Sequence, residues 1–158
     1  MVQENNTAPF LYRPASDGTS PFLFAVPHSG RYYPEDFVEK SPLTTEDLRR
    51  SEDAFVDKLF ESVPSSSASL LVATHARAYV DLNRAENELD PAMFSPKLDS
   101  SLLDVSYRVQ AGLGVIPQYV AEDTPIYHEP LPAREAEKRL KLIHRPYHQK
   151  LSTLLDNL

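Results

Sequence analysis

The stretch FLFAVPHSG, residues 22–30, joins a short apolar run to a polar turn. An apolar run without polar alternation is typical of a strand that is covered on both faces, as in a parallel sheet. The polar group His28-Ser29-Gly30 follows at the carboxyl end of this strand. Because open α/β sheets bind ligands outside the carboxyl ends of their strands, the stretch predicts both a sheet and a site at its edge.

Later apolar runs predict the rest of the sheet. Residues 70–73 and 78–82 are expected to form the second and third strands, and residues 115–117 a strand fragment. Strands that alternate with helical segments indicate an α/β fold with a mixed sheet flanked by helices. Only three strands are clear, so we expect an incomplete sheet with further strands after residue 158. An incomplete sheet has an exposed edge, which predicts self-association.

Two segments carry helical periodicity. The first begins at a capping residue, Thr44 or Thr45. Its apolar stripe consists of Leu48, Phe55, Leu59 and Val63. The second segment covers residues 132–158, and Pro146 is expected to kink it or to divide it in two. Residues 1–20 read as a polar lead-in, and residues 21–158 as the first portion of a single domain.

The composition excludes several classes of site. A formal net charge of −7 opposes a phosphate backbone, so nucleic-acid binding is not expected. The chain has no cysteine, so a metal ion must be held by His, Asp or Glu. The start of the chain lacks the basic and apolar regions of a secretory signal. No apolar run reaches the about 18 residues of a membrane span, and we therefore expect a cytoplasmic protein without a membrane partner.

Two groups of residues could hold a metal ion. The first is His28, whose neutral imidazole can bind zinc through one nitrogen while a neighbouring group orients the other. The alternative for this residue is a loop histidine that bonds to the backbone. The second is the pair Glu52-Asp53, which could cap a helix or, beside the loop of His28, supply an oxygen ligand.

The stretch RAYVDLNR, residues 77–84, is the most specific of the polar motifs. It places Asp81 and Asn83 at the end of an apolar run, between Arg77 and Arg84. One interpretation is a structural ion pair, since a buried carboxylate needs a partner and arginine is the usual one. The functional interpretation has Asn83 and Arg84 binding a substrate carboxylate while Arg77 stabilises an oxyanion.

The remaining histidines have less support as ligands. His144 and His148 stand four residues apart on the last predicted helix, a spacing that can bind metal. Pro146 lies between them and no glutamate follows the first, so we assign them structural or supporting roles. His75 and His128 have no supporting constellation.

These motifs, in this order, resemble the N-formylglutamate amidohydrolase family. The stretches that carry the resemblance are VPHSGRYYP (26–34), SEDAFVDKLF (51–60), ARAYVDLNR (76–84), GLGVIPQ (112–118), PIYHEPL (125–131) and RPYHQKL (145–151). They span the chain from residue 22 onward, and PHSG with YVDLNR is the most specific combination.

The resemblance implies a site and a fold. The fold would be similar to that of zinc carboxypeptidases and aspartoacylases. Zinc would be held by His28, by an acidic residue and by a second histidine. The acidic ligand would be Asp53, with Glu52 as its fallback. Arg77 would polarise the scissile carbonyl, and Asn83-Arg84 would hold the substrate carboxylate. The second histidine and the catalytic glutamate of the family are expected after residue 158.

The reaction that the resemblance implies is zinc-dependent hydrolysis of the amide bond of an N-acyl amino acid. N-formyl-L-glutamate would give formate and L-glutamate, a step of amino-acid catabolism. Two alternatives remain open: a related zinc hydrolase that acts on another N-acyl amino acid or a small peptide, and a non-catalytic fragment that binds a carboxylate.

Overall fold

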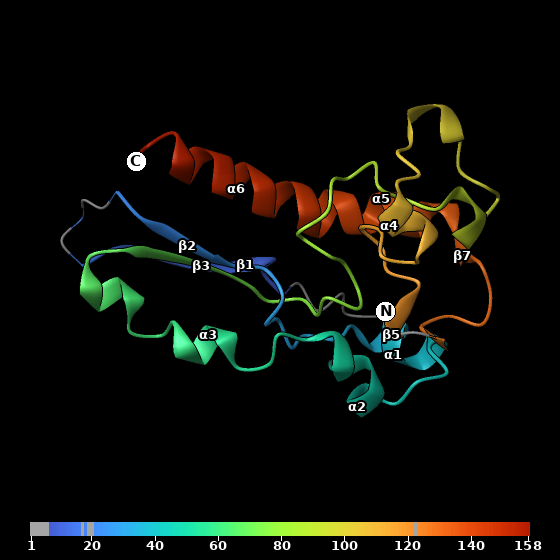
Figure 1. Ribbon diagram of the computed structural model, residues 1–158, viewed down its shortest axis with the longest axis horizontal. Helices are drawn as coiled ribbons and strands as arrows, with labels where there is room; N and C mark the ends of the chain where they lie inside the picture. The colour runs from blue at the N-terminus through green and yellow to red at the C-terminus, as the bar shows by residue number, and fades with distance from the viewer. Residues whose placement is uncertain (1–6, 17, 19–20, 122) are drawn as a thin grey trace, which may run out of the picture.

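A three-stranded mixed sheet lies at one end of the molecule. The computed structural model describes residues 7–16, 18, 21–121 and 123–158 (Figure 1). The sheet contains β1 (Phe10–Arg13), β2 (Leu23–Val26) and β3 (Ser69–Ala73) in the order β1-β3-β2. The central strand β3 is antiparallel to β1 and parallel to β2. All five of its residues are buried, as expected of a central strand.

The first two predicted strands are confirmed, but the expected covering of β2 is wrong. Phe24 is 39% exposed, and Ala25 beside it is also exposed. The reason is position, because β2 is an outer strand of the sheet. Burial in the core is instead concentrated on β3, whose Leu71 is fully buried.

The predicted third strand, residues 78–82, is wrong and is replaced by a buried turn. The amides of Tyr79 and Val80 both donate to the carbonyl oxygen of Ala76, which winds the backbone. The apolar residues of this turn are nonetheless almost fully buried. Periodicity alone cannot distinguish such a short buried run from a strand. The fragment at 115–117 is also not a strand; the nearby strand is β5 (Tyr119–Ala121), which pairs with β6 (Thr124–Pro125).

Short helices follow β2. They are α1 (Glu35–Lys40), α2 (Thr45–Leu48), η1 (Arg49–Ser51), α3 (Val56–Leu59) and η2 (Val63–Ser66). The predicted cap is confirmed, since the hydroxyl oxygen of Thr44 accepts from the amide of Asp47. The continuous apolar stripe is wrong, because Phe55 has a φ of 63° and interrupts the helical backbone. Phe55 and Leu59 are consequently exposed by 59% and 77%.

The middle of the chain consists of short elements that lead to a long C-terminal helical segment. These elements are η3 (Pro91–Met93), β4 (Phe94–Ser95), η4 (Ser100–Leu102), α4 (Tyr107–Gln110) and β7 (Leu131–Pro132). The helical segment contains α5 (Ala133–Arg139), a π-helical turn η5 (Leu140–His144) and α6 (Arg145–Leu155). Pro146 therefore lies at the start of α6, and a π-helical turn precedes it in place of a break.

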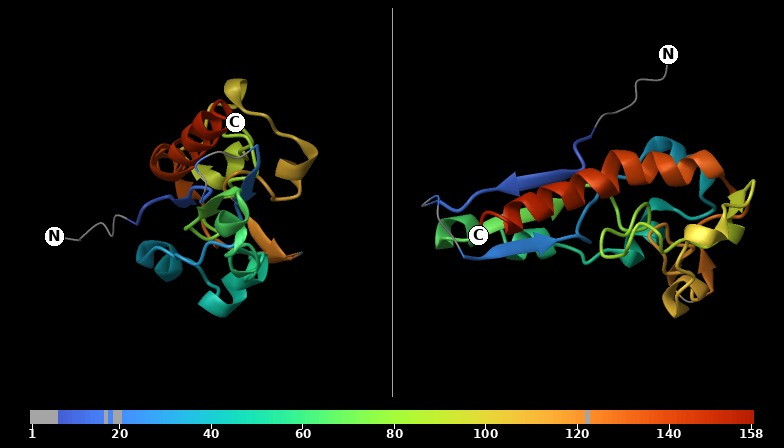
Figure 2. Two further views of the ribbon diagram at one scale, coloured as in Figure 1. Left: turned by 90° about the vertical axis from the view of Figure 1, so that its left-hand side faces the viewer. Right: turned by 90° about the horizontal axis from the view of Figure 1, so that it is seen from above.

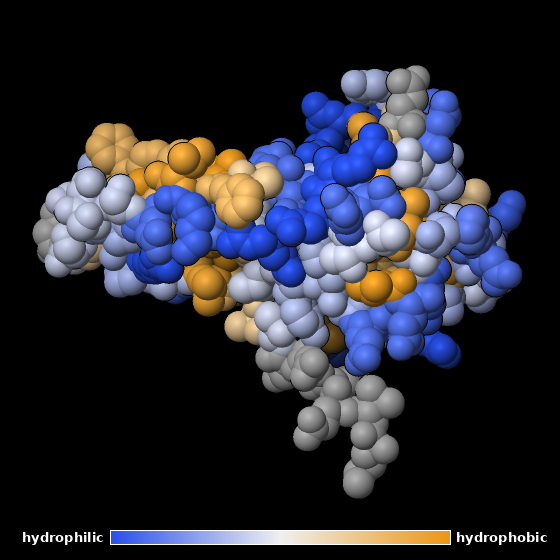
Figure 3. Space-filling view, turned by 90° about the horizontal axis from the view of Figure 1, so that it is seen from below, coloured by the Kyte–Doolittle hydropathy of each residue, from blue (hydrophilic) through white to orange (hydrophobic). Residues whose placement is uncertain are grey.

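The sheet lies between α6 on one side and the α3–η2 segment on the other (Figures 1 and 2). On the α6 side, the rings of Phe10 and Tyr147 meet edge to face at 6.4 Å. On the other side, Phe24 packs against Phe60 at 5.3 Å. Hydrophobic side chains gather on the surface at this end of the molecule (Figure 3). Self-association through this end stays a prediction.

No helix in the described part of the chain combines the length and the apolar character that a bilayer crossing would require.

Candidate functional site

The turn after β2 brings His28 against the loop that follows β3. The amide of Tyr32 donates to the carbonyl oxygen of Thr74, and the amide of Ala76 donates back to Tyr32. The two segments approach so closely that a Cβ at position 30 would overlap the carbonyl oxygen of His75. Gly30 is therefore required for this contact. The carboxyl end of β2 thus faces the buried turn that carries Arg77 and Asp81.

His28 and Asp81 form a buried pair at this contact. The Nε2 atom of His28 lies 2.7 Å from Oδ1 of Asp81, and both side chains are largely buried. Oδ2 of Asp81 accepts from Nε of Arg77 at 3.0 Å, and Oδ1 also accepts from the amide of Asn83. Burial raises the pKa of Asp81, but the hydrogen bond from His28, the charge of Arg77 and the hydrogen bond from the amide of Asn83 outweigh it and leave the pKa lowered. Asp81 is therefore ionised at neutral pH.

The ionised Asp81 fixes the orientation of the imidazole. An ionised carboxylate only accepts hydrogen bonds, so Nε2 of His28 must be the donor. In the neutral ring, Nδ1 then carries the lone pair, and it faces Oδ2 of Asp53 at 3.4 Å. The backbone keeps these side chains together, because the amide of Asp53 donates to the carbonyl oxygen of His28 at 3.0 Å. Nδ1 of His28 and Oδ2 of Asp53 then both present lone pairs, so a cation or a proton between them would stabilise their contact.

The spacing of this pair fits a metal ion. Ligand atoms about 2.0–2.2 Å from a tetrahedral zinc ion lie about 3.4 Å apart, which agrees with the separation of His28 Nδ1 and Asp53 Oδ2. A histidine whose other nitrogen donates to a carboxylate is the usual arrangement at zinc sites. Within the described residues, no group of three or more His, Asp or Glu side chains is placed to hold a metal. The described site thus offers two side chains that could bind a metal ion.

Glu52 is close to this pair but is already engaged. Its Oε1 accepts from the hydroxyl of Tyr33 at 2.5 Å, and its Oε2 lies 3.3 Å from Nε of Arg49. Its side chain is only 1% exposed. Burial and the hydrogen bond to Glu52 raise the pKa of Tyr33 well above its ordinary value. This arrangement favours Asp53 over Glu52 as the open carboxylate.

A cavity of about 190 Å³ opens beside these residues. Its polar lining comes from the η1 segment and the buried turn: Arg50, Ser51, Glu52, Asp53, Arg77 and Asp81. Its apolar wall contains Leu113, Pro117, Tyr119 and Val120. The cavity therefore combines three carboxylates, two arginines and an apolar wall, and small-molecule sites have a similar mixture of polar groups and apolar walls.

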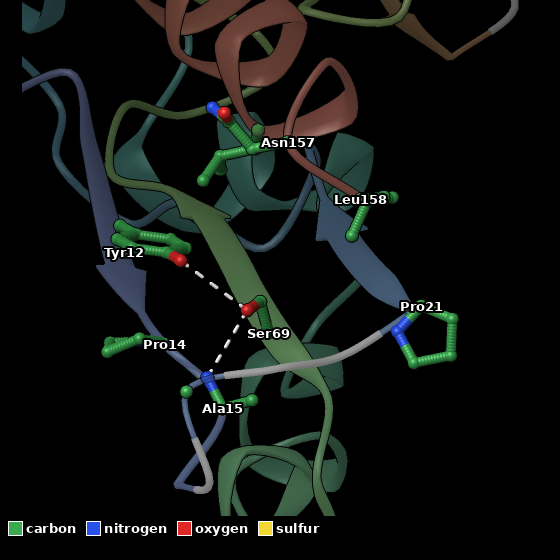
Figure 4. Close-up of a pocket in the computed structure, with 9 residues that line it drawn as sticks. Tyr12, Pro14, Ala15, Pro21, Ser69, Asn157 and Leu158 are labelled. Carbon is green, nitrogen blue, oxygen red and sulfur yellow. Dashed lines mark hydrogen bonds between the residues drawn. The ribbon is translucent and has the colours of Figure 1, made fainter.

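A larger cavity of about 500 Å³ lies elsewhere, between the β1–β3 edge of the sheet and the end of α6 (Figure 4). Its polar side chains include Tyr12, Ser69 and Asn157. The Ser69 hydroxyl is already occupied, because it bonds to the Tyr12 hydroxyl and accepts from the amide of Ala15. The chemistry of the site is therefore assigned to the smaller cavity.

The structure brings together only part of the predicted site. His28, Asp53 and Arg77 converge. Asn83 and Arg84 do not line the cavity, and the Arg84 guanidinium donates to the carbonyl oxygens of Leu113 and Asn83. Since Leu113 is part of the cavity wall, Arg84 supports that wall from behind. Binding of a substrate carboxylate by Asn83 and Arg84 stays a prediction.

The two histidines of the last helical segment also contact the loop that carries Asn83. Nε2 of His144 lies 2.8 Å from the carbonyl oxygen of Arg84, and Nε2 of His148 lies 3.0 Å from that of Leu82. Burial lowers the pKa of His144, which favours a neutral ring that donates to the carbonyl. Both contacts agree with the structural role expected for these residues.

Two members of the site were missed from the sequence. Asp81 was expected to pair with arginine, which it does, but it also orients His28. Tyr33 has no role assigned from the sequence, although its hydroxyl donates to Glu52. No local pattern indicates either contact, because both join segments that are distant in sequence. Asp81 and His28, for example, are 53 residues apart.

Comparison with known proteins supports the resemblance to the N-formylglutamate amidohydrolase family. The N-formylglutamate deformylase of Pseudomonas putida is 28% identical over 143 residues, which make up 89% of this chain and 47% of that protein. The crystal structure of N-formylglutamate amidohydrolase from Ralstonia eutropha JMP134 superposes with a TM-score of 0.87 at 35% identity, over 95% of this chain and 52% of the other. The chain thus spans about half the length of these relatives.

The sequence model that describes N-formylglutamate amidohydrolase matches residues 20–158, which include every site residue described above. The chain therefore belongs to the N-formylglutamate amidohydrolase family.

Proposed function

We propose that this chain takes part in the metal-dependent hydrolysis of an N-acyl amino acid. The substrate we propose is N-formyl-L-glutamate, which would yield formate and L-glutamate. The observation that carries the proposal is the pair of His28 Nδ1 and Asp53 Oδ2, 3.4 Å apart, with Nε2 of the same histidine bound to Asp81. Family membership supports the substrate, since both relatives compared above carry N-formylglutamate in their names.

His28 and Asp53 would hold the ion, and zinc is the metal we propose. The neutral imidazole and the carboxylate are ligands that zinc accepts, and their spacing agrees with its tetrahedral geometry. When bound, the ion would supply a Lewis acid that polarises the scissile carbonyl and activates water. The zinc carboxypeptidase-like architecture is part of the same proposal.

The other side chains would position the substrate and the ligands. Asp81 holds the His28 ring through Nε2, which keeps Nδ1 directed at Asp53. Arg77 uses Nε for Asp81, and its terminal nitrogens would donate to an oxygen that gains negative charge during the reaction. Exclusion of water would be the task of the apolar wall, which includes Leu113 and Val120.

The ligand set of the described residues would need completion. One histidine and one carboxylate leave a tetrahedral ion with two open positions. We propose that the third ligand and a general base correspond to the part of the relatives' length that this chain does not span. The complete site would then combine the described cavity with those groups.

The proposal is tested by zinc binding and formate release. The purified protein should bind zinc, and the His28→Ala and Asp53→Asn variants should each lower zinc affinity by about tenfold or more. Formate release from N-formyl-L-glutamate is followed with a coupled formate assay in protein that also contains the third ligand and the general base proposed above. It should fall by at least about 100-fold in His28→Ala. His128→Ala provides a matched control, because His128 is exposed and lies outside the cavity. Unchanged zinc stoichiometry and turnover in His28→Ala would overturn the proposal.

A second candidate function is non-catalytic binding of a carboxylate. The observation that favours it is the absence, within the described residues, of a three-ligand group, while two arginines line the cavity. In this case N-formyl-L-glutamate would raise the melting temperature of the protein without any formate release, and added zinc would change neither result. Formate release that depends on zinc would exclude it.

A further inference from the structure

The charged side chains that line the 190 Å³ cavity differ in whether they have a hydrogen-bond or ion-pair partner. Glu52 is held by Tyr33 and Arg49, and Asp81 by His28 and Arg77. Asp53 faces Nδ1 of His28. Among these lining residues, each carboxylate and Arg77 therefore has a charged or polar partner within the site.

Arg50 differs from the other charged residues of this lining. Its side chain is exposed at the cavity, and no hydrogen bond or ion pair joins it to any residue in the described part of the chain. Its neighbour Arg49, by contrast, bonds to Glu52. Arg50 belongs to η1, and the opposite wall of the cavity is formed by Tyr119 and Val120 of β5.

The proposed substrate has more anionic groups than the predicted anchor can bind. N-formyl-L-glutamate carries two carboxylates, and the sequence motif Asn83-Arg84 was assigned to one of them. Arg84 does not line the cavity, however, and its guanidinium already donates through Nε and Nη1 to backbone carbonyls. Arg77 is directed by its bond to Asp81. One substrate carboxylate is therefore without a cation.

We propose that Arg50 binds the second carboxylate of the substrate and so makes the site selective for N-acyl dicarboxylic amino acids. This inference rests on the proposed function above. A guanidinium presents two parallel N–H donors that match the two oxygens of a carboxylate. The open side chain at the cavity can form this paired contact without first breaking an ion pair. An N-acyl amino acid with a neutral side chain would leave Arg50 unpaired, and the site would bind it more weakly.

The test compares two ligands that differ in one group. N-formyl-L-glutamate and N-formyl-L-glutamine have nearly the same shape, but only the first has a side-chain carboxylate. Dissociation constants for both are measured by titration calorimetry on the zinc-supplemented protein. The wild-type protein should prefer the glutamate compound by about tenfold, a typical effect of a charge-assisted hydrogen bond at a partly exposed site. The Arg50→Gln variant should bind the two compounds with similar affinity.

Three controls define the outcome. Arg50→Lys should retain part of the preference, because the positive charge remains while the paired geometry is lost. Arg134→Gln should retain all of it, since Arg134 is exposed and outside the cavity. Unchanged melting temperatures would show that the variants are folded. A preference that persists in Arg50→Gln would overturn the assignment of Arg50 and leave the proposed function intact.

Other results also decide the question. Equal weakening of both ligands in Arg50→Gln would overturn selectivity by Arg50, since it indicates general damage to the cavity. If the wild-type protein binds neither compound, or binds both equally, the proposed substrate itself is wrong, and the inference about Arg50 falls with it.

Discussion

Two buried polar clusters share the segment between Arg77 and Asp81, but they differ in how their charges are enclosed. In the first, Asp81 holds His28 and Arg77, and the free nitrogen of His28 faces the exposed Asp53. In the second, the 2% exposed Arg139 donates to the carbonyl oxygen of Tyr79, the hydroxyl of Tyr127 and the carboxylate of Glu135. We name these the His28 cluster and the Arg139 cluster.

This difference in enclosure indicates that the His28 cluster is a candidate site and the Arg139 cluster a structural element. The Arg139 guanidinium lies 4.0 Å from the centre of the Tyr79 ring and is also flanked by Phe37 and Tyr127. Arg139 lines neither of the two cavities described above. The His28 cluster has the same kind of buried ion pair, but three of its members, Asp53, Arg77 and Asp81, line a cavity. A buried charge therefore points to a ligand site where it borders a cavity, as in the His28 cluster.

The largest expected effect is a loss of stability in the Arg139 cluster. Arg139→Ala should lower the free energy of unfolding by about 3–5 kcal/mol, because it leaves the buried Glu135 with only the more distant Lys138 and removes packing against three aromatic rings. Urea denaturation measures this change, and Arg134→Ala on the same helix should stay within about 0.5 kcal/mol of wild type. A small effect at Arg139 would remove the distinction between the two clusters.

Asp81→Asn should affect binding in the His28 cluster as well as stability. The substitution keeps the shape but loses the charge that fixes the His28 ring, so zinc affinity should fall by about 10–100-fold. The pKa of Asp81 is lowered, so its ion pairs stabilise the fold above the ordinary carboxyl pKa of about 3.9 and are lost as the pH falls through the lower folded value. The variant should therefore lose about 1–3 kcal/mol at neutral pH. Wild-type zinc affinity in this variant would contradict the orienting role of Asp81.

His75 should make stability depend on pH. It is buried against Tyr32 and Tyr79, and burial lowers its pKa to about 4. The unfolded chain binds the proton more readily, so stability falls as the pH drops from about 6.5 to about 4. We expect the wild type to lose about 1–2 kcal/mol between pH 7 and pH 5 from this residue, and His75→Phe to lose correspondingly less. Identical pH profiles for the two proteins would show that His75 is readily protonated in the fold.

Tyr33→Phe should have the smallest effect. The variant removes the hydroxyl that donates to Glu52 while keeping the ring that stacks near Phe37. Because Glu52 retains Arg49 and adjoins a cavity that water can enter, the cost should be about 1 kcal/mol. Thermal unfolding measures it. A much larger loss, or a fall in zinc affinity equal to that of Asp53→Asn, would move Glu52 from a supporting to a ligand role.

The sequence was sufficient to predict the parts of the fold that depend on local pattern. The strands at 23–26 and 69–73 and the cap at Thr44 follow from apolar runs and from capping chemistry. The third strand failed because Ala78, Tyr79 and Val80 are apolar for a reason other than pairing in a sheet. They fill the core from a turn, and a turn buried on all sides has the same composition as a strand.

The candidate site was predictable in its residue types but not in its contacts. His28 at a strand end and the carboxylates at 52 and 53 could be selected because a chain without cysteine offers a metal ion only His, Asp or Glu as ligands. The contacts among these residues depend on which distant segments come together in the fold. The bond between His28 and Asp81, the engagement of Glu52 by Tyr33 and the position of Arg84 behind the cavity wall depend on long-range packing that periodicity does not encode.

The backbone hydrogen bond from the amide of Asp53 to the carbonyl oxygen of His28 provides a probe of how often the site opens. The proton of that amide can exchange with deuterium only when the two ligand-bearing segments separate. Its exchange rate therefore reports how often the contact between the His28 turn and the Asp53 segment opens, even in protein that carries out no turnover. An ion that bridges the two side chains would slow this single exchange while leaving amides in the Arg139 cluster unchanged.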